Sequence, residues 1–469
     1  MLPNLYNTDD TIAAIATAEG VSAIGVIRIS GKQAFSICNK IYKNKDLTQL
    51  NSHTIHYGFI TDGDEVIDEV MLSVFKSPRS FTTEDSIEIS AHGSPYILSR
   101  ILQLLIDNGA RLAQPGEFTM RAFMHGRLDL AQAEAVGDLI AAQNKAQADV
   151  AIKQIRGGLS EDIKSLREQL LNFASLIELE LDFGEEDVEF ADRSQLNKLI
   201  EQILHHIDPI IQSFQYGNAI KNGIPVAIIG RPNAGKSSLL NLVLNDDRAI
   251  VSDIAGTTRD TVEEVLNIEG LPFRFIDTAG IRATQDTIEK IGIEKALKKI
   301  EEAQVVIYIF DVSDTSIEEV LADLEMITAK NERIHLVVLA NKTDLIGQSA
   351  QSNLLQQLNK VGYTNTLSIQ ANKGSEQALL VLKSTLHESV KRGLVSDGQT
   401  ILTNLRHYKS LSDAREALQV VVEGLGNRLT SDLLALDIKR ALNALGEVTG
   451  EISSQEILIN IFGKFCIGK

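Results

Sequence analysis

The segment 230–237 has the residue types and spacing that bind nucleotide phosphates: Gly-Arg-Pro-Asn-Ala-Gly-Lys-Ser. It stands between the apolar run PVAIIG and the periodic run SSLLNLVL, so we expect a loop between a strand and a helix. Backbone N–H groups of such a loop, and the amino terminus of the helix, attract negative charge. Lys236 is expected to reach the β- and γ-phosphates, and the Ser237 hydroxyl to bind Mg²⁺. The predicted phosphate-binding residues are Asn233, Ala234, Gly235, Lys236, Ser237 and Ser238.

Three later segments select the base and complete the magnesium site. Asp277 follows the run FRFI and can bind Mg²⁺ through water, while the Gly280 N–H can sense the γ-phosphate. Thr258 is placed to complete the Mg²⁺ shell only when the γ-phosphate is present. Asp344 follows the run IHLVVLA and can accept from the N1 and N2 hydrogens of guanine, which adenine does not offer. GTP is therefore the predicted substrate, and the further nucleotide-binding residues are Ser252, Asp253, Ile254, Ala255, Gly256, Thr257, Thr258, Asp277, Thr278, Ala279, Gly280, Asn341, Lys342 and Asp344.

Two positions depart from the pattern of the common small GTPases. Ile281 follows Gly280, where a glutamine that orients the attacking water often stands. Because an apolar side chain cannot hold that water, another group must do so. The loop that backs the guanine, often Ser-Ala-Lys, is Gln370-Ala371-Asn372 here. The Ala371 N–H can still contact the guanine carbonyl.

The elements that position these residues alternate between strand-like and helical runs over 221–385. The runs PVAIIG, FRFID, VVIYIFD and IHLVVLA are typical of strands in a mostly parallel sheet with crossover helices. We therefore predict an α/β GTPase domain here, of the Ras-like P-loop type.

The flanks of this domain have different periodicities. Residues 1–125 alternate short apolar runs with turns, including a hairpin at Asp62-Gly63-Asp64 and a helix near 94–108, which predicts an α+β domain. Residues 126–220 and 386–469 are expected to be helical, forming one discontinuous domain into which the GTPase domain is inserted. The stripes that carry this prediction are Ile163, Leu166, Leu170, Phe173 and Ile177, then Leu411, Ala414, Leu418, Val421 and Leu425, and, after a Thr430 cap, Leu434, Ile438, Ala441 and Leu445.

Composition limits the class of protein. A chain of 469 residues is too long for one hydrophobic core, so several domains are expected. No apolar run approaches the roughly 18 residues that span a bilayer, and no secretory signal is evident, so we expect a cytoplasmic protein without a membrane contact. The two cysteines are far apart, which argues against a disulfide scaffold or a cysteine-ligated zinc. The net charge of −18 means that an RNA partner must meet a local basic patch or be bound by a basic partner protein.

The segments 230–237 and 254–260, together with Ile281, resemble the TrmE/Era group of P-loop GTPases. Three further stretches resemble one family of that group, the tRNA modification GTPases MnmE (TrmE), and this resemblance runs from end to end. The stretches are Ile27-Arg-Ile-Ser-Gly31, Pro115-Gly-Glu-Phe-x-x-Arg-Ala-Phe-x-x-Gly-Arg-x-Asp-Leu-x-Gln-Ala-Glu-Ala-Val136 and Phe465-Cys-Ile-Gly-Lys469.

The resemblance implies an activity in tRNA modification. With a flavin-dependent (FAD) partner, MnmG (GidA), a member of this family adds an aminomethyl or carboxymethylaminomethyl group to C5 of the wobble uridine of certain tRNAs. A tetrahydrofolate (5-formyl- or methylene-) supplies the one-carbon unit. The resemblance also implies a homodimer, a heterotetramer with MnmG, and GTP hydrolysis driven by dimerisation of the GTPase domains around K⁺.

Several residue roles follow from the resemblance alone. Asn233 matches a K⁺ ligand, and the loop that closes over the ion contains Ser252, Ile254 and Thr257. A K⁺ ion beside the phosphates can neutralise developing charge where other GTPases use an arginine finger. Glu289 matches the carboxylate that orients water, which answers the problem raised by Ile281. As simple alternatives, Asn233 is only a spacer in the loop and Glu289 only a surface charge at the start of a helix.

A second set of residues matches the folate site of the family. Arg28 and Arg127 suit the glutamate and carbonyl groups of a folate, and Glu88 suits its amino-pyrimidine ring. On the residues alone, each of them is more often part of an ion pair that holds the fold or lies on the surface. Lys469 and Cys466 belong to the terminal motif, which is expected to fold back toward the folate, with Cys466 as a possible nucleophile.

Two other functions remain open at the level of sequence. One is a regulatory switch in ribosome assembly, as in other members of the TrmE/Era group. Those proteins typically carry an RNA-binding module after the GTPase domain, and no basic segment interleaved with aromatic residues is obvious here. The other is a folate-dependent aminomethyltransferase whose catalysis is indifferent to GTP.

Overall fold

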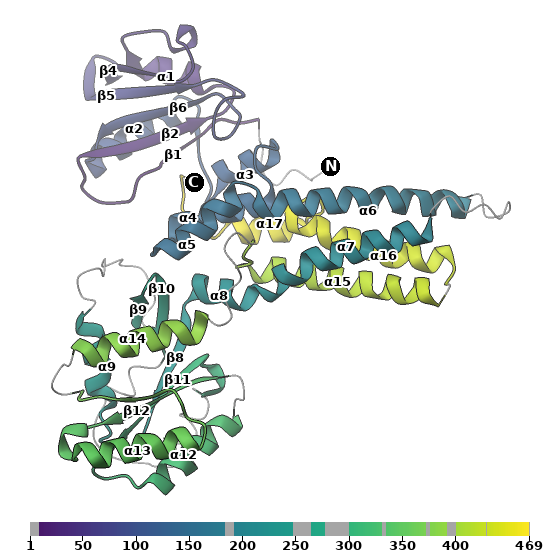
Figure 1. Ribbon diagram of the computed structural model, residues 1–469. Helices are drawn as coiled ribbons and strands as arrows, with labels where there is room; N and C mark the ends of the chain where they lie inside the picture. Colours follow the sequence, from purple (N-terminus) through teal and green to yellow (C-terminus); the bar gives the residue numbers. More distant parts are fainter. Residues whose placement is uncertain are drawn as a thin grey trace. The chain divides into compact units, whose positions relative to one another are not determined.

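The computed structural model describes residues 9–182, 192–246, 264–276, 300–330, 334–371, 376–391, 400–427 and 429–468. The chain divides into two compact units (Figure 1). The first comprises residues up to 141, 150–206 and 409 onward, and the second comprises 142–149 and 207–408. Among the described residues, no helix combines the length and the apolar character needed to cross a membrane.

The first unit contains a mixed sheet, its covering helices and a set of long helices. Its sheet strands are β1 (Ile12–Ile15), β2 (Ile24–Ser30), β3 (Tyr42–Lys43), β4 (Thr54–Asp62), β5 (Glu65–Phe75), β6 (Ser86–His92) and β7 (Arg111–Leu112). The helices that lie between these strands along the chain, or directly follow them, are α1 (Ala34–Ile41), η1 (Leu47–Gln49), α2 (Pro95–Asp107), α3 (Glu117–Met124) and α4 (Leu130–Ala141). The remaining helices of this unit are α5 (Lys145–Ile155), α6 (Gly158–Asp182), α7 (Arg193–Gln212), α15 (Leu405–Gly426), α16 (Ser431–Thr449) and α17 (Gln455–Phe462), and three of them, α5, α7 and α15, also include residues of the second unit.

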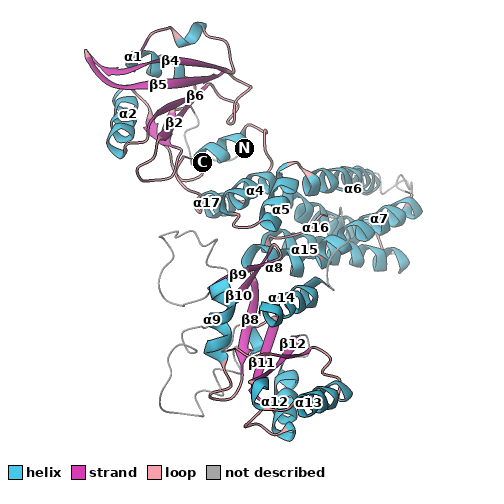
Figure 2. Cartoon of the chain, turned by 60° about the vertical axis from the view of Figure 1, so that its left-hand side comes forward, coloured by secondary structure: helices cyan, strands magenta, loops and turns pink. Residues whose placement is uncertain are grey.

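The described strands of the first sheet run in the order β3-β4-β5-β6-β2-β1-β7. Neighbours are antiparallel except for β1 and β7. The predicted hairpin is the turn between β4 and β5, and the periodic stretch near 94–108 is α2. The helices α1 and α2 lie beside this sheet (Figure 2), and alternate side chains of its central strands are buried with them in one hydrophobic core. The prediction of an α+β architecture for this part of the chain is therefore correct.

The helical stripes also form as predicted, on helices from both flanks of the chain. Ile163, Leu170 and Ile177 of α6 are fully buried, and α6 packs along α16, whose Ile438 and Ala441 are fully buried. Thr430 is the N-cap residue of α16, although its side chain accepts no capping hydrogen bond. The helix α4 contacts both α6 and α16. Segments nearly 300 residues apart in sequence thus share one core.

The second unit contains the predicted mostly parallel sheet. Its elements are α8 (Phe214–Asn222), β8 (Ile224–Ile229), α9 (Lys236–Asp246), β9 (Glu264–Ile268), β10 (Leu271–Phe275), β11 (Val305–Asp311), α12 (Ile317–Lys330), β12 (His335–Asn341), η2 (Thr343–Leu345), α13 (Gln348–Lys360), β13 (Thr366–Ser368) and α14 (Glu376–Lys391).

The described strands of this sheet run in the order β13-β12-β11-β8-β10-β9, and only the β9–β10 pair is antiparallel. Every residue of β11 is buried, as expected for a strand with both faces covered. Tyr308 and Phe310 of β11 pack with Val320 and Leu324 of α12 in the core of this unit. The carboxyl ends of β8, β11 and β12 meet at one edge of the sheet, where a doubly covered parallel sheet binds its ligand.

Candidate functional site

The phosphate-binding loop lies at that edge, between β8 and α9. Its conformation requires glycine at two positions. A methyl group at Gly230 would lie 2.0 Å from the carbonyl oxygen of Ile309, and one at Gly235 would lie 2.2 Å from Asn341 Nδ2. Gly235 also has a φ of +102°, which side chains rarely adopt. Asn233, at the exposed crest of the loop, has a φ of +62°, a conformation that asparagine tolerates better than most residues.

Lys236 and Asn341 hold the loop from two sides. The Lys236 ammonium donates to the carbonyl oxygens of Gly230 (2.7 Å) and Arg231 (2.8 Å), so the cation lies over the loop from the first turn of α9. Asn341 is 2% exposed; its Nδ2 donates to Ala234 O (2.8 Å) and its Oδ1 accepts from the Ala371 N–H (3.1 Å). One buried side chain thus joins the phosphate-binding loop, the end of β12 and the predicted guanine-backing loop.

Lys342 and Asp311 form an ion pair beside Asn341. The Lys342 ammonium donates to Asp311 Oδ2 (2.5 Å), and the Ser313 N–H (2.9 Å) and hydroxyl (2.6 Å) donate to Asp311 Oδ1. Burial alone would raise the pKa of Asp311, but the hydrogen bonds from Lys342 and Ser313 outweigh it and lower this pKa below its usual value. The Asp311 carboxylate is therefore charged at neutral pH. Asp344 lies in η2, the short helix that begins directly after Lys342.

Arg231 anchors the loop to α12. Its guanidinium donates to Glu319 Oε1 (2.6 Å) and Asp323 Oδ2 (3.0 Å), and the buried Tyr308 hydroxyl also donates to Asp323 Oδ2 (2.7 Å). Glu319 is itself held at the start of α12, because its Oε2 accepts from the Ser316 N–H (3.1 Å). The pairs are partly exposed, so each is expected to stabilise the loop only modestly.

The structure therefore brings together the predicted residues Asn233, Ala234, Gly235, Lys236, Ser237, Ser238, Asn341, Lys342, Asp344 and Ala371 at one edge of the sheet, from the loop, α9, β12, η2 and the segment after β13. The Ser237 hydroxyl belongs to the first turn of α9, where a phosphate-bound Mg²⁺ would be coordinated. The other predicted residues lie outside the described part of the chain: Ser252, Asp253, Ile254, Ala255, Gly256, Thr257, Thr258, Asp277, Thr278, Ala279, Gly280 and Glu289.

The residues predicted for folate gather around one aromatic ring in the first unit. The Arg28 guanidinium lies 5.6 Å from the centre of the Phe81 ring and 5.5 Å from that of Phe118, and the Arg127 guanidinium lies 5.1 Å from that of Phe81. Arg28 and Glu88 face each other across β2 and β6, and two nitrogens of Arg28 donate to Glu88 Oε1 (2.9 and 2.8 Å).

This cluster fits a flat, polar and anionic ligand. The ring of Phe81 and the two guanidinium planes offer stacking surfaces, and the guanidinium groups offer charge. Both bonds from Arg28 go to Oε1 of Glu88, and no described residue is hydrogen-bonded to Oε2. Arg127 also donates to Ser80 O (2.7 Å), and burial lowers its pKa. A carboxylate can pair with an amino-pyrimidine ring and a guanidinium group with a carboxylate tail, so these residue types suit a folate.

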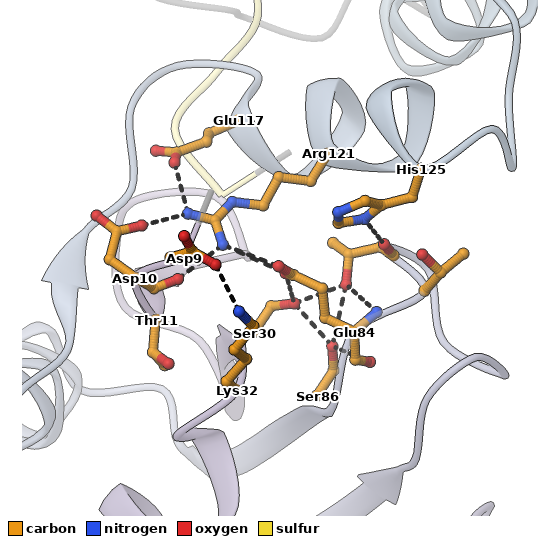
Figure 3. A network of polar contacts seen from close by, with 12 residues as sticks. Asp9, Asp10, Thr11, Ser30, Lys32, Glu84, Ser86, Glu117, Arg121 and His125 are labelled. Atoms are coloured by element: carbon orange, nitrogen blue, oxygen red, sulfur yellow. Dashed lines mark hydrogen bonds and ion pairs between the residues drawn. The ribbon is translucent and has the colours of Figure 1, made fainter. Parts of the chain in front are cut away.

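A buried network holds α3 against the first sheet (Figure 3). Arg121 is fully buried and points from α3 toward three carboxylates: Asp10 (2.7 Å), Glu117 (2.9 Å) and Glu84 (3.1 Å). It also donates to the carbonyl oxygen of Asp10 (2.9 Å). Arg111 bridges Asp10 and Glu117 from the other side (2.6 Å each). Because α3 carries Phe118, this network fixes one wall of the cluster around Arg28.

The carboxyl-terminal motif lies against the same part of the first unit. The Gly116 N–H donates to the Cys466 carbonyl oxygen (3.4 Å), and the Phe465 ring packs on Phe462, which is buried beside α3 and α4. A methyl group at Gly468 would lie 2.3 Å from the carbonyl oxygen of Ile15 in β1. The side chain of Cys466 is exposed. Lys469 lies outside the described residues.

Sequence reasoning missed four groups of site residues. It did not identify Phe81 and Ser80 beside the predicted folate residues, the ion pair of Asp311 with Lys342, the anchoring of Arg231, or the network around Arg121. One signal was available for Asp311, because it ends the strand-like run VVIYIFD at the same sheet edge as Asn341. Asp10, Glu84 and Arg121 are separated by up to 111 residues, and no spacing rule joins them.

Comparisons with known proteins cover almost the whole chain. The family model described as the MnmE helical domain matches residues 130–466, and the one described as the GTP-binding protein TrmE N-terminus matches residues 11–127. A tRNA modification GTPase MnmE of Flavobacterium johnsoniae is 53% identical over 98% of this chain and 99% of its own length. One of Cytophaga hutchinsonii is 50% identical over 99% and 98%. Among solved structures, Aquifex aeolicus Era bound to GDP.AlF4- matches 42% of this chain and 67% of its own, with 27% identity and a TM-score of 0.27.

Proposed function

The chain belongs to the MnmE family of tRNA modification GTPases, and from this premise we propose that its GTP hydrolysis drives the modification of wobble uridine in tRNA. The product carries an aminomethyl or carboxymethylaminomethyl group on C5, with the carbon supplied by a tetrahydrofolate bound near Arg28, Glu88 and Arg127. A flavin-dependent partner protein, MnmG, completes the reaction in the cytoplasm. The observation that carries the GTPase half of this proposal is the buried Asn341, which joins the phosphate-binding loop to the guanine side of the site.

The proposed hydrolysis uses position and charge rather than a covalent intermediate. Lys236 and the N–H groups at the start of α9 bind the β- and γ-phosphates, and Ser237, with Thr258, binds the Mg²⁺ that neutralises them. Asp277 supports that ion through water. Asp344 and the Ala371 N–H select guanine. Glu289 orients the attacking water, since Ile281 cannot.

The crest of the phosphate-binding loop suits a monovalent cation. Asn233 is exposed and lies between the two anchors of the loop, Arg231 on α12 and Ala234 on Asn341. Its amide oxygen is a neutral ligand of the kind that K⁺ accepts. We propose that Asn233, Ser252, Ile254 and Thr257 bind K⁺ when two GTPase domains meet, and that this ion stabilises the charge that develops on the phosphates.

The GTPase half is tested by measuring turnover at several protein concentrations in K⁺ and in Na⁺. In K⁺, turnover per chain is expected to rise with protein concentration, because dimerisation completes the ion site. In Na⁺ it is expected to fall by about tenfold or more, since the smaller ion fits the oxygen ligands poorly. Glu289→Ala is expected to keep its affinity for GTP and lose turnover. Equal turnover in K⁺ and in Na⁺ would mean that Asn233 does not bind K⁺. If Glu289→Ala lost affinity for GTP and turnover to the same extent, Glu289 would be a structural residue.

The part of the proposal that concerns folate also includes the carboxyl-terminal motif, which we propose lies close to the ligand. Cys466 and Lys469 follow Phe465, which anchors the tail beside α3 and α4. The backbone of Gly468 lies against β1, the neighbour of the strand that carries Arg28. We propose that Lys469 binds the folate with Arg28 and Arg127, and that Cys466 lies close enough to take part in the transfer of the carbon unit.

A further inference from the structure

The carboxyl ends of β11 and β12 place a buried acid beside the proposed guanine site. Asp311, the last residue of β11, pairs in register with Asn341, the last residue of β12. Its side chain is 12% exposed. Oδ1 is occupied by the Ser313 N–H and hydroxyl, which leaves Oδ2 facing Lys342. The two bonds from Ser313 therefore orient the Asp311 carboxylate independently of Lys342.

Lys342 adopts an unusual backbone conformation. Its φ is +59°, in the left-handed region that a lysine rarely enters. It is flanked by Asn341, which joins the loops of the site, and it precedes η2, which contains Asp344. A non-glycine residue persists in this region only when its surroundings enforce it, and such residues gather at ligand sites. The ion pair with Asp311 then decides where the side chain of Lys342 runs.

The ion pair contributes little to joining the two strands. The strands β11 and β12 pair without interruption from Val305 with His335 to Asp311 with Asn341. The Val312 N–H also donates to Asn341 O (3.2 Å). The backbone ladder therefore already fixes the two strand ends. What the pair adds is the direction of one long side chain at the edge where the ligand binds.

We propose that Asp311 is a positioning residue for the guanine base: it holds the Lys342 ammonium so that the aliphatic part of Lys342 covers one face of the ring. This inference rests on the proposed guanine site and deepens it. A lysine can cover an apolar surface with its methylene groups while its charged end stays paired elsewhere. Asp344 reads the edge of the base, whereas the pair of Asp311 and Lys342 supports its face. The two contributions to affinity are therefore separable.

The test measures the dissociation constants of GDP and IDP for the full chain, by competition against a fluorescent GDP. IDP lacks the 2-amino group, so the ratio of the two constants reports the contact of Asp344 with the edge of the base. Asp311→Asn keeps the size of the side chain and removes its charge. It is expected to weaken GDP and IDP alike, by about tenfold, because a charge-assisted bond that fixes Lys342 is lost. The ratio of the two constants is expected to stay unchanged.

Asp314→Asn is the matched control, since Asp314 is exposed in the same loop and undergoes the same chemical change. It is expected to leave both constants unchanged. Lys342→Met removes the ion pair from its other end, and remains informative if Asp311→Asn does not fold. It is expected to weaken GDP and IDP in the same proportion. In the Lys342→Met background, Asp311→Asn is expected to have no further effect, because Asp311 acts through Lys342.

Three results would overturn the inference. They are an unchanged affinity of Asp311→Asn, a change in the ratio of the GDP and IDP constants, and effects of the two substitutions that add in the double variant. A failure of the proposed site itself looks different. In that case the unaltered chain would bind GDP no better than ADP, whatever residue stands at position 311.

Discussion

Replacing Arg121 with methionine is expected to lower the free energy of unfolding of the sheet-containing part of the first unit by about 3–5 kcal/mol. Arg121 is fully buried and is the shared partner of Asp10, Glu84 and Glu117. Glu117 is also fully buried, so removing the cation leaves a buried carboxylate with one charged partner fewer. Arg111 still pairs with Asp10 and Glu117, which keeps the loss below that of an entirely unpaired cluster.

The measurement is chemical denaturation of the full chain, followed by a signal from the first sheet. Arg100→Met is the matched control, because Arg100 pairs with Asp62 at the surface. That control is expected to change the free energy of unfolding by no more than about 1 kcal/mol. If Arg121→Met were as stable as Arg100→Met, the network would not hold α3.

The same network predicts sensitivity to acid. Burial would raise the pKa of Asp10, but the hydrogen bonds from Arg111 and Arg121 outweigh it and lower this pKa below its usual range. A lowered pKa in the folded state means that the contribution of Asp10 is present above the unfolded value and is lost as pH falls through the folded one. Arg121→Met is therefore expected to differ most from the unaltered chain above about pH 4, and the difference is expected to shrink below it.

Replacing Asn341 with alanine is expected to reduce the affinity for GTP by about a hundredfold or more. The side chain satisfies the Ala234 carbonyl and the Ala371 N–H, and at 2% exposure no water replaces it without rearrangement. Each buried group left unpaired costs about 1–3 kcal/mol, and both belong to loops that we propose bind the nucleotide. The loss is expected in binding of GTP and GDP alike, since both loops serve the bound base and phosphates.

Equilibrium binding of GTP and GDP checks this expectation. Asn353→Ala is the control, because Asn353 is exposed on α13 in the same unit. It is expected to leave both affinities unchanged. An Asn341→Ala variant that bound GTP normally would show that the joined loops do not form the nucleotide site.

Sequence periodicity predicted the elements well where neighbouring residues determine them. The hairpin of β4 and β5, the helix α2, the stripes of α6 and α15, and the strand–loop–helix around Lys236 all form as expected. Each depends on an alternation or spacing within about 20 residues. The gathering of the residues predicted for phosphate and guanine was also predictable, because they follow strand-like runs and parallel strands end at one edge.

The tertiary ion pairs were not predictable in the same way. Asp10, Glu84 and Arg121 meet only because β1, the segment before β6, and α3 fold together, and no local pattern encodes that meeting. The terminal motif around Phe465 likewise contacts residues near Gly116, about 350 positions earlier in the chain. Arg28 and Glu88 were predicted as ligand residues, and the structure adds that they face each other and share Phe81 with Arg127.

The measurement that tests the central claim most directly is the analysis of tRNA nucleosides from cells in which this chain is deleted and then restored. Deletion is expected to remove the C5 side chain from the wobble uridine of the susceptible tRNAs. The unaltered chain is expected to restore it, and Lys236→Ala, present at the same level, is not, because its loop cannot stabilise the phosphates of GTP. Unchanged tRNA after deletion would contradict the proposed function. Full restoration by Lys236→Ala would contradict the claim that GTP hydrolysis drives it.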